Sequence, residues 1–523
     1  MPSLRFSHGC CENSALSRLR FRHYTFPLTA APNPRRAAAP TGDTLVTQAR
    51  TLYRKIVDAH TVKTIDSDTV LLYCDAHFAN EYTSPQAFAG VAARGLPVLS
   101  PDSHLCVVSH IIPSRDESPR RIYDAASLKQ AETLEANCRR FGIKAFFGAN
   151  DPDQGLEHVV MAERGLVRPG MVVICGDSHT TSHGALGALG FGVGTSEIEH
   201  ILATETLVYR LASSMKITIR GKLSHGATAK DLALYVLRKI SAGGALGCVV
   251  EYEGEAIGEL SVEGRITLCN LTVEAGARGA LIAPDQKTVD WVLAHAPELK
   301  DEEKEMALAY WKTLKADPDA EYARTVEIDA AEVRPTVTWG TSPDQNVFLD
   351  EAVPSPESFP DPVEREAAER GLRYQGIAAA QKMSDVSVDY VFIGSCTNAR
   401  LPDLVAAAEV LKGRRLAPGV KGMVVPGSMR TRRDAEALGL DVVFKDAGFE
   451  WRKPGCSLCL AMNEDVLGSG VRCAATTNRN FEGRMGRGSR THLVSPETAA
   501  ASGVLGRFGT AEELDRLMPR TND

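Results

Sequence analysis

Three cysteines in two polar stretches of the sequence could hold a metal centre. Cys396 lies in "GSCTNAR", and Cys456 and Cys459 lie in "PGCSLCLAMN". A structural zinc site takes four protein ligands, and no fourth Cys or His lies close to these three in the sequence. Three thiolates that leave one position open are typical of an iron–sulfur cluster with one iron free for substrate. On spacing alone, a zinc site, a redox pair and ordinary core cysteines remain as alternatives.

The elements that must position these cysteines alternate between strands and helices. In residues 389–411, the apolar run "YVFIG" predicts a buried strand that leads into Cys396, and Pro402 suits the first turn of a following helix. In residues 171–175, "MVVIC" predicts a second such strand. The loop after it carries four polar residues, which are Asp177, Ser178, His179 and His183. Ligands gather at the carboxyl ends of parallel strands, so we predict an α/β fold with mainly parallel sheets and a site where these loops meet.

Three further segments have local signals. Residues 44–60 predict an amphipathic helix. Ser196 and Glu199 have the spacing of a capping box at the start of another helix. Residues 341–372 are rich in Pro, Asp, Glu and Ser and predict a linker between domains.

The bulk composition excludes several protein classes. At roughly 150 residues per domain, a chain of 523 residues predicts about three domains. The net charge of −7 and the absence of a dense basic stripe argue against a nucleic-acid-binding face. No run of about 18 apolar residues predicts a membrane span. The twelve cysteines lack the spacing of a secreted framework, which indicates reduced cysteines in a cytoplasmic environment.

The N-terminal segment differs from the rest of the chain. Its first 42 residues contain six Arg, no Lys and a single acid, Glu12. This composition resembles an organellar transit segment, and a disordered tail or an upstream start codon that is not the real one are the alternatives. We therefore take residues 1–44 as an N-terminal extension, and an organellar location stays open beside the cytoplasm.

Many motifs in a fixed order identify the family that the chain resembles. "GSCTNAR", "GCSLCLAMN", "TTNRNFEGRMG", "VICGDSHTTSHGALGALGFGVGTSEIEH" and "EYTSPQAFAG" resemble the aconitase superfamily. The likeness is greatest to the large subunits of 3-isopropylmalate dehydratases, also called isopropylmalate isomerases. It implies a three-layer αβα fold with three related subdomains. The expected divisions are subdomain 1 at 45–212, subdomain 2 at 213–340, subdomain 3 at 341–510 and a C-terminal tail at 511–523.

The resemblance implies a cofactor and a reaction. In that family three cysteines hold a [4Fe–4S] cluster, one per chain, and by motif they are Cys396, Cys456 and Cys459 here. The reaction removes water from a 2-hydroxy acid and adds it back at the neighbouring carbon, which converts 2-isopropylmalate to 3-isopropylmalate in leucine biosynthesis. An alternative is a paralogous hydro-lyase for another branched hydroxy diacid, such as citramalate (2-methylmalate), or a catalytically impaired paralogue.

The resemblance also implies the site residues. His110 corresponds to the histidine that protonates the leaving hydroxyl, His158 to the partner of Asp177, and Glu251 to the acid that partners His179. The implied substrate-binding residues are Ser178, His183, Arg479 and Arg484. A carboxylate beside an imidazole fixes its tautomer, and a guanidinium grips a carboxylate at two points.

The sequence departs from the family pattern near His110. Ser109 stands where the family has Asp, Ala76 where Arg is common, and Asn80 where His is common. A serine can orient an imidazole but cannot stabilise an imidazolium by charge, so we expect a weaker proton donor. On this reasoning, restoring Asp at position 109 should raise turnover.

The chain ends before the further domain that carries the family's catalytic serine. The resemblance therefore implies a heterodimer with a small subunit of about 200 residues or fewer, which carries the swivelling domain and that serine. We expect a small hydroxy diacid as substrate, no nucleic-acid partner and no membrane partner. A regulatory RNA-binding relative and a zinc-structural protein are the non-catalytic alternatives.

Overall fold

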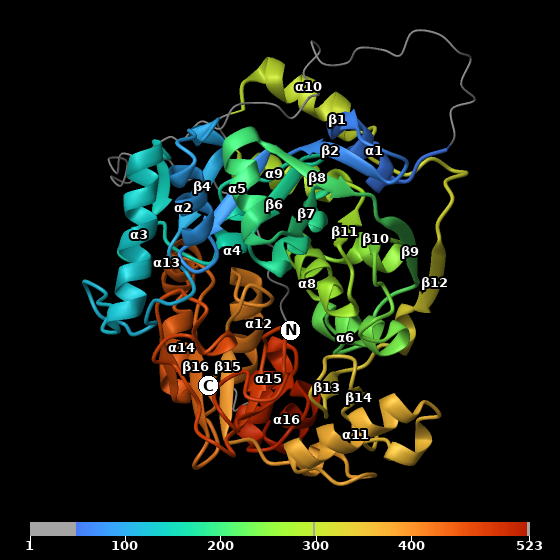
Figure 1. The fold of residues 1–523 in the computed structure, drawn as a ribbon. Helices are drawn as coiled ribbons and strands as arrows, with labels where there is room; N and C mark the ends of the chain where they lie inside the picture. The colour runs from blue at the N-terminus through green and yellow to red at the C-terminus, as the bar shows by residue number, and fades with distance from the viewer. Residues whose placement is uncertain (1–48, 297–298, 520–523) are drawn as a thin grey trace, which may run out of the picture.

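The computed structural model describes residues 49–296 and 299–519, and the expected N-terminal extension at 1–44 lies outside the described residues. Three parallel sheets form the frame of this part of the chain (Figure 1). The first sheet has the order β5-β4-β3-β6-β7. Its strands are β3 (Ala76–Asn80), β4 (His104–Val107), β5 (Ala145–Phe147), β6 (Val172–Cys175) and β7 (Leu189–Gly192).

The second and third sheets are also parallel throughout. The second has the order β11-β10-β9-β12, with β9 (Ser213–Arg220), β10 (Cys248–Glu253), β11 (Gly279–Ile282) and β12 (Arg324–Asp329). The third has the order β17-β16-β15-β18-β19, with β15 (Tyr390–Ile393), β16 (Lys421–Val424), β17 (Phe449–Trp451), β18 (Arg472–Ala475) and β19 (Arg490–Leu493).

Two small antiparallel sheets complete the described strands. One has the order β1-β2-β8, and the other is the β13-β14 pair. Their strands are β1 (Thr61–Thr64), β2 (Thr69–Tyr73), β8 (Thr206–Arg210), β13 (Thr336–Thr338) and β14 (Asn346–Phe348).

Helices connect the strands and cover the sheets. They are α1 (Leu52–His60), α2 (Pro85–Ala93), α3 (Ala125–Phe141), α4 (Glu157–Glu163), α5 (Thr195–Thr204), α6 (Ala229–Ile240), α7 (Glu255–Glu259), α8 (Val262–Thr272), α9 (Gln286–His295), α10 (Asp301–Trp311), α11 (Pro362–Gln375), α12 (Leu401–Leu411), α13 (Met429–Ala437), α14 (Leu440–Ala447), α15 (Pro496–Leu505) and α16 (Ala511–Leu517). The predicted three-layer α/β fold with mainly parallel sheets is confirmed. Among the described residues, no helix is long and apolar enough to cross a membrane.

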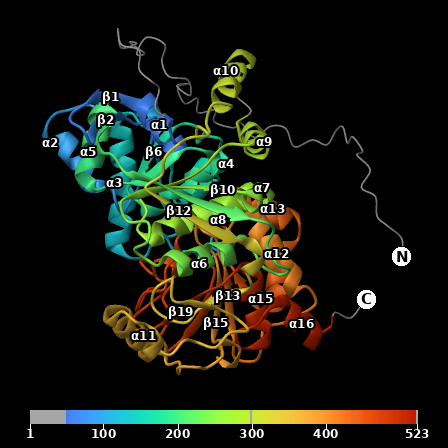
Figure 2. The ribbon, with the colours of Figure 1, turned by 90° about the vertical axis from the view of Figure 1, so that its right-hand side faces the viewer.

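The carboxyl ends of the first and third sheets face each other. Leu156 N donates to Gly427 O at 2.8 Å, and Cys456 N donates to Ser109 O at 2.9 Å. Figure 2 shows the resulting arrangement, with the blue-to-green N-terminal part above the orange-to-red C-terminal part. Loops that follow strands of both sheets are therefore brought to one place, as the rule for parallel sheets predicts.

A close backbone contact holds the polar loop after β6 between the first two sheets. This loop is the 3-10 helix η2 (Ser178–Leu186), which packs against β11. A Cβ atom on Gly184 would lie 1.8 Å from the carbonyl oxygen of Ala280, so only glycine fits there.

Two predicted helix starts are wrong. The helix predicted at 44–60 begins at Leu52, where Thr51 accepts a hydrogen bond from Arg54 N. The capping box predicted from Ser196 and Glu199 is displaced, because α5 begins at Thr195 and Gly194 N donates to Glu197. Side-chain hydrogen bonds to the first turn decide each start.

The segment predicted as a linker and the segment predicted as a tail both contain helix. Residues 341–372 include the first part of α11, whose start is capped by Asp361. Residues 511–517 form α16, in which Leu514 is buried.

Candidate functional site

Loops that follow strands of the third sheet carry the three cysteines. Cys396 follows β15. Cys456 precedes the 3-10 helix η7 (Ser457–Cys459), which follows β17, and Cys459 is the last residue of that helix. All three side chains line one cavity. The structure thus brings together three residues whose outer members, Cys396 and Cys459, lie 63 positions apart in the sequence.

The backbone of these loops is held in an uncommon conformation. Ser395, Ser457 and Ala461 have φ values of 81°, 49° and 51°, three of the six positive values at non-glycine residues in the described chain. Such a conformation costs on the order of 1–2 kcal/mol per residue and persists only where the surroundings enforce it. Its concentration beside the cysteines marks this part of the fold as a functional site.

Polar groups approach the cysteine sulfurs from several elements. Asn270 Nδ2 and Asn478 Nδ2 donate to Cys396 Sγ at 3.3 and 3.6 Å. Arg484 Nη2 lies 3.9 Å from Cys459 Sγ. Hydrogen bonds to sulfur lower the electron density on a thiolate and are a recurrent feature of iron–sulfur sites.

The protonation of the thiols indicates what they could hold. Burial, together with the charge of Cys459, raises the pKa of the Cys396 thiol to about 12, and burial raises the pKa of the Cys456 thiol well above its usual value. Thiolates are the metal-binding form, so these groups become ligands when a cationic centre offsets the cost of burial. Arg484 Nε, which is buried and has no hydrogen-bond partner within the described chain, adds a donor toward an anion. The residues present therefore fit a cluster with three cysteine ligands.

The wall of the cavity combines residues from the first and third sheets. The lining residues are His110, Leu156, Glu157, His158, Asp177, His179, Ser395, Cys396, Cys456, Cys459, Leu460, Asn478 and Arg484. Imidazoles and carboxylates on one side therefore face thiols and a guanidinium on the other.

Asp177 is the centre of a histidine network on the cavity wall. The predicted pairing with His158 is present, because His158 Nε2 lies 3.0 Å from Asp177 Oδ1. His110 Nε2 lies 3.6 Å from Asp177 Oδ2, and His179 Nδ1 lies 3.3 Å from Asp177 Oδ1. Burial raises the pKa of Asp177, but hydrogen bonds from the three histidines outweigh it and hold the pKa well below the usual range. Asp177 is thus a carboxylate across the neutral pH range.

The acid that partners His179 is Glu274, and the predicted role of Glu251 is wrong. His179 Nε2 lies 2.9 Å from Glu274 Oε1. Glu251 instead accepts hydrogen bonds from Tyr53 N at 2.8 Å and from Tyr322 Oη at 2.8 Å. Glu251 therefore holds the start of α1 against the second sheet, and among the described residues it forms no hydrogen bond or ion pair with the histidine network.

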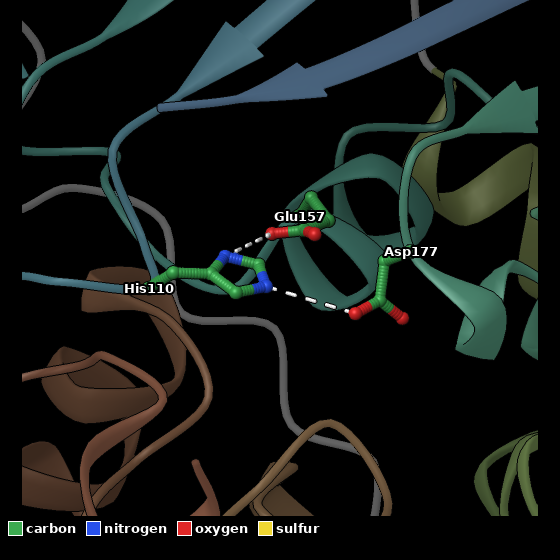
Figure 3. A group of neighbouring side chains, drawn as sticks. All are labelled: His110, Glu157 and Asp177. Atoms are coloured by element: carbon green, nitrogen blue, oxygen red, sulfur yellow. Dashed lines mark ion pairs between the residues drawn. The ribbon is translucent and has the colours of Figure 1, made fainter. Parts of the chain in front are cut away.

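His110 is flanked by two carboxylates (Figure 3). Its Nδ1 lies 3.7 Å from Glu157 Oε2, and its Nε2 faces Asp177. Burial lowers the pKa of His110, but the charge of Glu157, the hydrogen bond to Asp177 and the charge of Glu81 raise it to about 10. The expectation of a weakened proton donor is therefore wrong in its premise, because Glu157 supplies the negative charge that Ser109 lacks.

Three of the implied substrate-binding residues do not line the cavity. His183 packs edge-on against Phe78 and His158, with ring centroids 5.8 and 5.6 Å apart. Arg479 Nε donates to Glu274 Oε1 at 2.8 Å, and its Nη2 donates to Ser178 Oγ at 2.9 Å. Of the implied set, only Arg484 lies on the cavity wall.

Sequence reasoning missed Glu157, Glu274 and Asn270. Glu157 had a signal, since it is an acid next to His158 in the otherwise apolar run "GLEHVVMA". Glu274 lies in "TVEAGAR", where nothing in the local pattern separates it from an exposed acid. Asn270 lies on α8 within 3.3 Å of a cysteine that is 126 residues away, so only the fold reveals it.

A family model and a solved structure each match most of the chain. A family model described as the aconitase family (aconitate hydratase) matches residues 54–506. Among solved structures, the chain is similar to the holo-form of aconitase X from Thermococcus kodakaraensis, with 12% sequence identity and a TM-score of 0.44. That similarity covers 85% of this chain and 89% of the other.

Proposed function

The chain belongs to the aconitase family, and from this premise we propose that it is the large subunit of a hydro-lyase that isomerises 2-isopropylmalate to 3-isopropylmalate. The observation that carries the proposal is the convergence of Cys396, Cys456 and Cys459 with His110 and Asp177 on one cavity. A thiol trio faces an acid–base network there, as removal of a hydroxyl group requires.

Cys396, Cys456 and Cys459 would hold a [4Fe–4S] cluster. When bound, that cluster supplies a Lewis acid for the substrate hydroxyl, which is a poor leaving group on its own. Asn270 and Asn478 would donate hydrogen bonds to the sulfur of Cys396.

His110 holds the proton that the leaving hydroxyl needs. Its Nε2 is directed toward the cavity and Asp177, and the two flanking carboxylates keep the imidazolium protonated until the hydroxyl departs. As the C–O bond breaks, the proton passes from Nε2 to the departing oxygen, and water leaves.

Arg484 and the Asp177 network would hold the substrate in place. The Arg484 guanidinium lies on the cavity wall and suits a carboxylate of the diacid. The chain from Asp177 through His179 to Glu274 and Arg479 fixes the ring orientations around the reacting carbon.

A small subunit would complete the site. Two aromatic side chains beside the cavity wall are about half exposed, Tyr82 at 45% and Phe481 at 48%. Tyr82 stacks on His110, and Phe481 lies under Arg484. A partner seated on these rings would enclose the substrate and bring the base that removes the proton from the neighbouring carbon.

A panel of branched hydroxy diacids tests the proposal. The chain is co-expressed with the small-subunit chain encoded nearest to it, the cluster is reconstituted without oxygen, and turnover is followed by chromatography of the diacids. We expect the highest kcat/KM with 2-isopropylmalate, and no turnover by either subunit alone. Faster turnover of citramalate would favour the alternative substrate, and no turnover of any diacid by a cluster-loaded complex would reject the proposed function.

The alternative of an impaired paralogue rests on Ser109, Asn80 and Ala76. Ser109 and Asn80 both donate hydrogen bonds to Glu157, so these two departures occur together with a carboxylate that restores the charge beside His110. This compensation favours an active enzyme over an impaired one.

A further inference from the structure

Glu157 is one of the two carboxylates that flank His110, and the proposed function uses only its negative charge. We propose that Glu157 is the positioning residue for His110, and that it acts through the Ser109 hydroxyl to fix the tautomer of the ring. The inference rests on the proposed function only for the identification of His110 as the proton donor.

His110 is the cationic partner of the buried Glu157 carboxylate. Glu157 is the first residue of α4 and is 2% exposed. Within the described ranges, no Lys or Arg forms an ion pair with it, and the nearest basic atom is His110 Nδ1 at 3.7 Å. A buried carboxylate without a cationic partner is costly, so the imidazolium of His110 is what stabilises its charge.

The hydrogen bonds of Ser109 assign the protons on His110. The Ser109 hydroxyl has one proton, which it donates to Glu157 Oε2 at 2.7 Å. Its oxygen lies 2.8 Å from His110 Nδ1 and must accept there. Nδ1 therefore carries a proton in both charge states of the ring. Nε2, which faces Asp177 in Figure 3, is the nitrogen that gives and takes the mobile proton.

The second oxygen of Glu157 is occupied by a neutral donor. Asn80 Nδ2 donates to Glu157 Oε1 at 3.0 Å. The amide cannot turn over, because Asn80 Oδ1 accepts from Tyr82 N at 3.0 Å and from Thr83 N at 2.9 Å. Asn80 and Ser109 thus hold both oxygens of the carboxylate without neutralising it.

The same contacts favour a hydrogen-bonded relay, which runs from Glu157 through the Ser109 hydroxyl to His110, over a metal site. Ligand atoms of His110, Glu157 and Asp177 lie within 4.8 Å of one another, so these residues have the donor types for a cation. However, N–H and O–H groups are directed at both oxygens of Glu157, and these donors would oppose a cation there. The geometry therefore favours a hydrogen-bonded relay.

The relay also predicts what an aspartate at position 109 would do. A carboxylate there would lie beside Glu157, in the place of the hydroxyl that now donates to it. Two adjacent buried carboxylates cannot both ionise readily, so one of them would take up a proton. Ser109 and Glu157 therefore work as a pair, and a change in one needs a change in the other.

The kinetic test moves the carboxylate from position 157 to position 109 in the reconstituted two-subunit enzyme. Glu157→Gln should lower kcat by about 100-fold, at the lower end of the effects of general acids, while KM changes little. Ser109→Asp alone should lower kcat about tenfold or more. The double variant Ser109→Asp/Glu157→Gln should recover at least tenfold over Glu157→Gln. A double variant no better than Glu157→Gln overturns the proposal.

A second readout does not need a substrate. Nitrogen-15 NMR of the full chain labelled at histidine, before and after cluster reconstitution, reports which ring nitrogen of His110 carries a proton, with His110→Gln to assign the signal. Tautomers exist only in the neutral ring, so the spectra are followed as the pH is raised above about 10, where His110 loses its second proton. In the neutral ring of the wild type the proton should stay on Nδ1, and Glu157→Gln and Ser109→Ala should both give a mixture of tautomers. Identical spectra of the neutral ring in the wild type and the soluble Ser109→Ala chain would overturn the relay. If the relay signature holds but no diacid reacts, the proposed function alone fails.

Discussion

Glu274 Oε1 lies 2.9 Å from His179 Nε2, although 95 residues separate them in the sequence. Arg479 Nε donates to the same carboxylate at 2.8 Å. Burial raises the pKa of Glu274, but the hydrogen bond and charge of His179 and the charge of Arg479 outweigh it and lower the pKa. A single carboxylate thus joins the loop after β6 to the loop after β18.

This relationship predicts a specific loss in Glu274→Gln. The variant keeps the shape but removes the charge, so His179 loses one of the two carboxylates that raise its pKa. Loss of such a supporting contact typically costs about 10–100-fold in activity. Steady-state kinetics on the reconstituted two-subunit enzyme measure the loss.

Glu251→Gln is the matched control. Glu251 is also a buried acid, but its partners are Tyr53 N, Leu52 N and the Tyr322 hydroxyl. We expect kcat within about threefold of the wild type and a lower temperature of unfolding, since a hydrogen bond to a buried acceptor is worth about 1–3 kcal/mol. A large loss of kcat in Glu251→Gln with none in Glu274→Gln would contradict the assignment.

The sequence predicted those parts of the site that lie next to a strand end. Cys396 and Asp177 directly follow the buried runs of β15 and β6, and parallel-sheet topology alone brings such loops together. Burial pattern and loop position carry this information locally, so the loops of Cys396 and Asp177 could be predicted from strand ends, whereas the grouping of Cys456 and Cys459 with Cys396 came from the family resemblance.

The sequence could not predict contacts that depend on how separate sheets pack. Glu274 and Glu251 both belong to elements around the second sheet, and only the packing of η2 beside β11 decides which one reaches His179. Glu157 was not predicted for a different reason. Its role depends on hydrogen bonds from both Ser109 and Asn80, and each of these residues alone looks like the loss of a family residue.

Cys396→Ser should abolish the visible absorbance of the reconstituted cluster and the turnover of the enzyme. Serine is a poor cluster ligand, and the remaining two cysteines leave a second iron without a protein ligand. The far-UV circular dichroism should stay close to that of the wild type, because the thiol is part of a loop and not of a hydrophobic core.

Cys248→Ser controls for the loss of a cysteine. Cys248 is half-buried at the start of β10, and it does not line the cavity. The Cys248→Ser variant should retain both the cluster and the turnover of the enzyme. Iron and sulfide contents of Cys396→Ser equal to those of Cys248→Ser would refute the role of Cys396 as a ligand.

Arg484→Lys should raise the KM for the diacid by about tenfold or more. A lysine keeps the charge but loses the planar fork that binds a carboxylate at two points. Arg479→Lys is the comparison, because that guanidinium already binds Glu274 and Ser178. Arg479→Lys should mainly lower kcat, because Arg479 binds the Glu274 carboxylate that contacts His179. Equal KM effects in the two variants would show that cavity position does not decide substrate contact.

Lys230 predicts a pH dependence of stability. It lies on α6, is 1% exposed, and its Nζ donates to Thr476 O at 2.9 Å and to Asn398 Oδ1 at 3.4 Å, in the loops beside the cysteines. Burial lowers its pKa to about 7 from an ordinary value of 10.5, despite the opposing charges of Asp403 and Cys459. Below pH 7 the side chain is charged in both the folded and the unfolded chain, so it adds no pH dependence there.

Between about pH 7 and 10.5 the folded chain gives up this proton while the unfolded chain keeps it. The unfolded state then binds more protons, so the free energy of unfolding rises with pH by at most about 1.4 kcal/mol per pH unit. Lys230→Met lacks the titrating group, so its free energy of unfolding should lack this rise with pH. The difference between the calorimetric unfolding temperatures of the two chains should therefore shift in favour of the wild type as pH rises from 7 to 10.5, and a constant difference over that range would show that Lys230 stays charged in the folded protein.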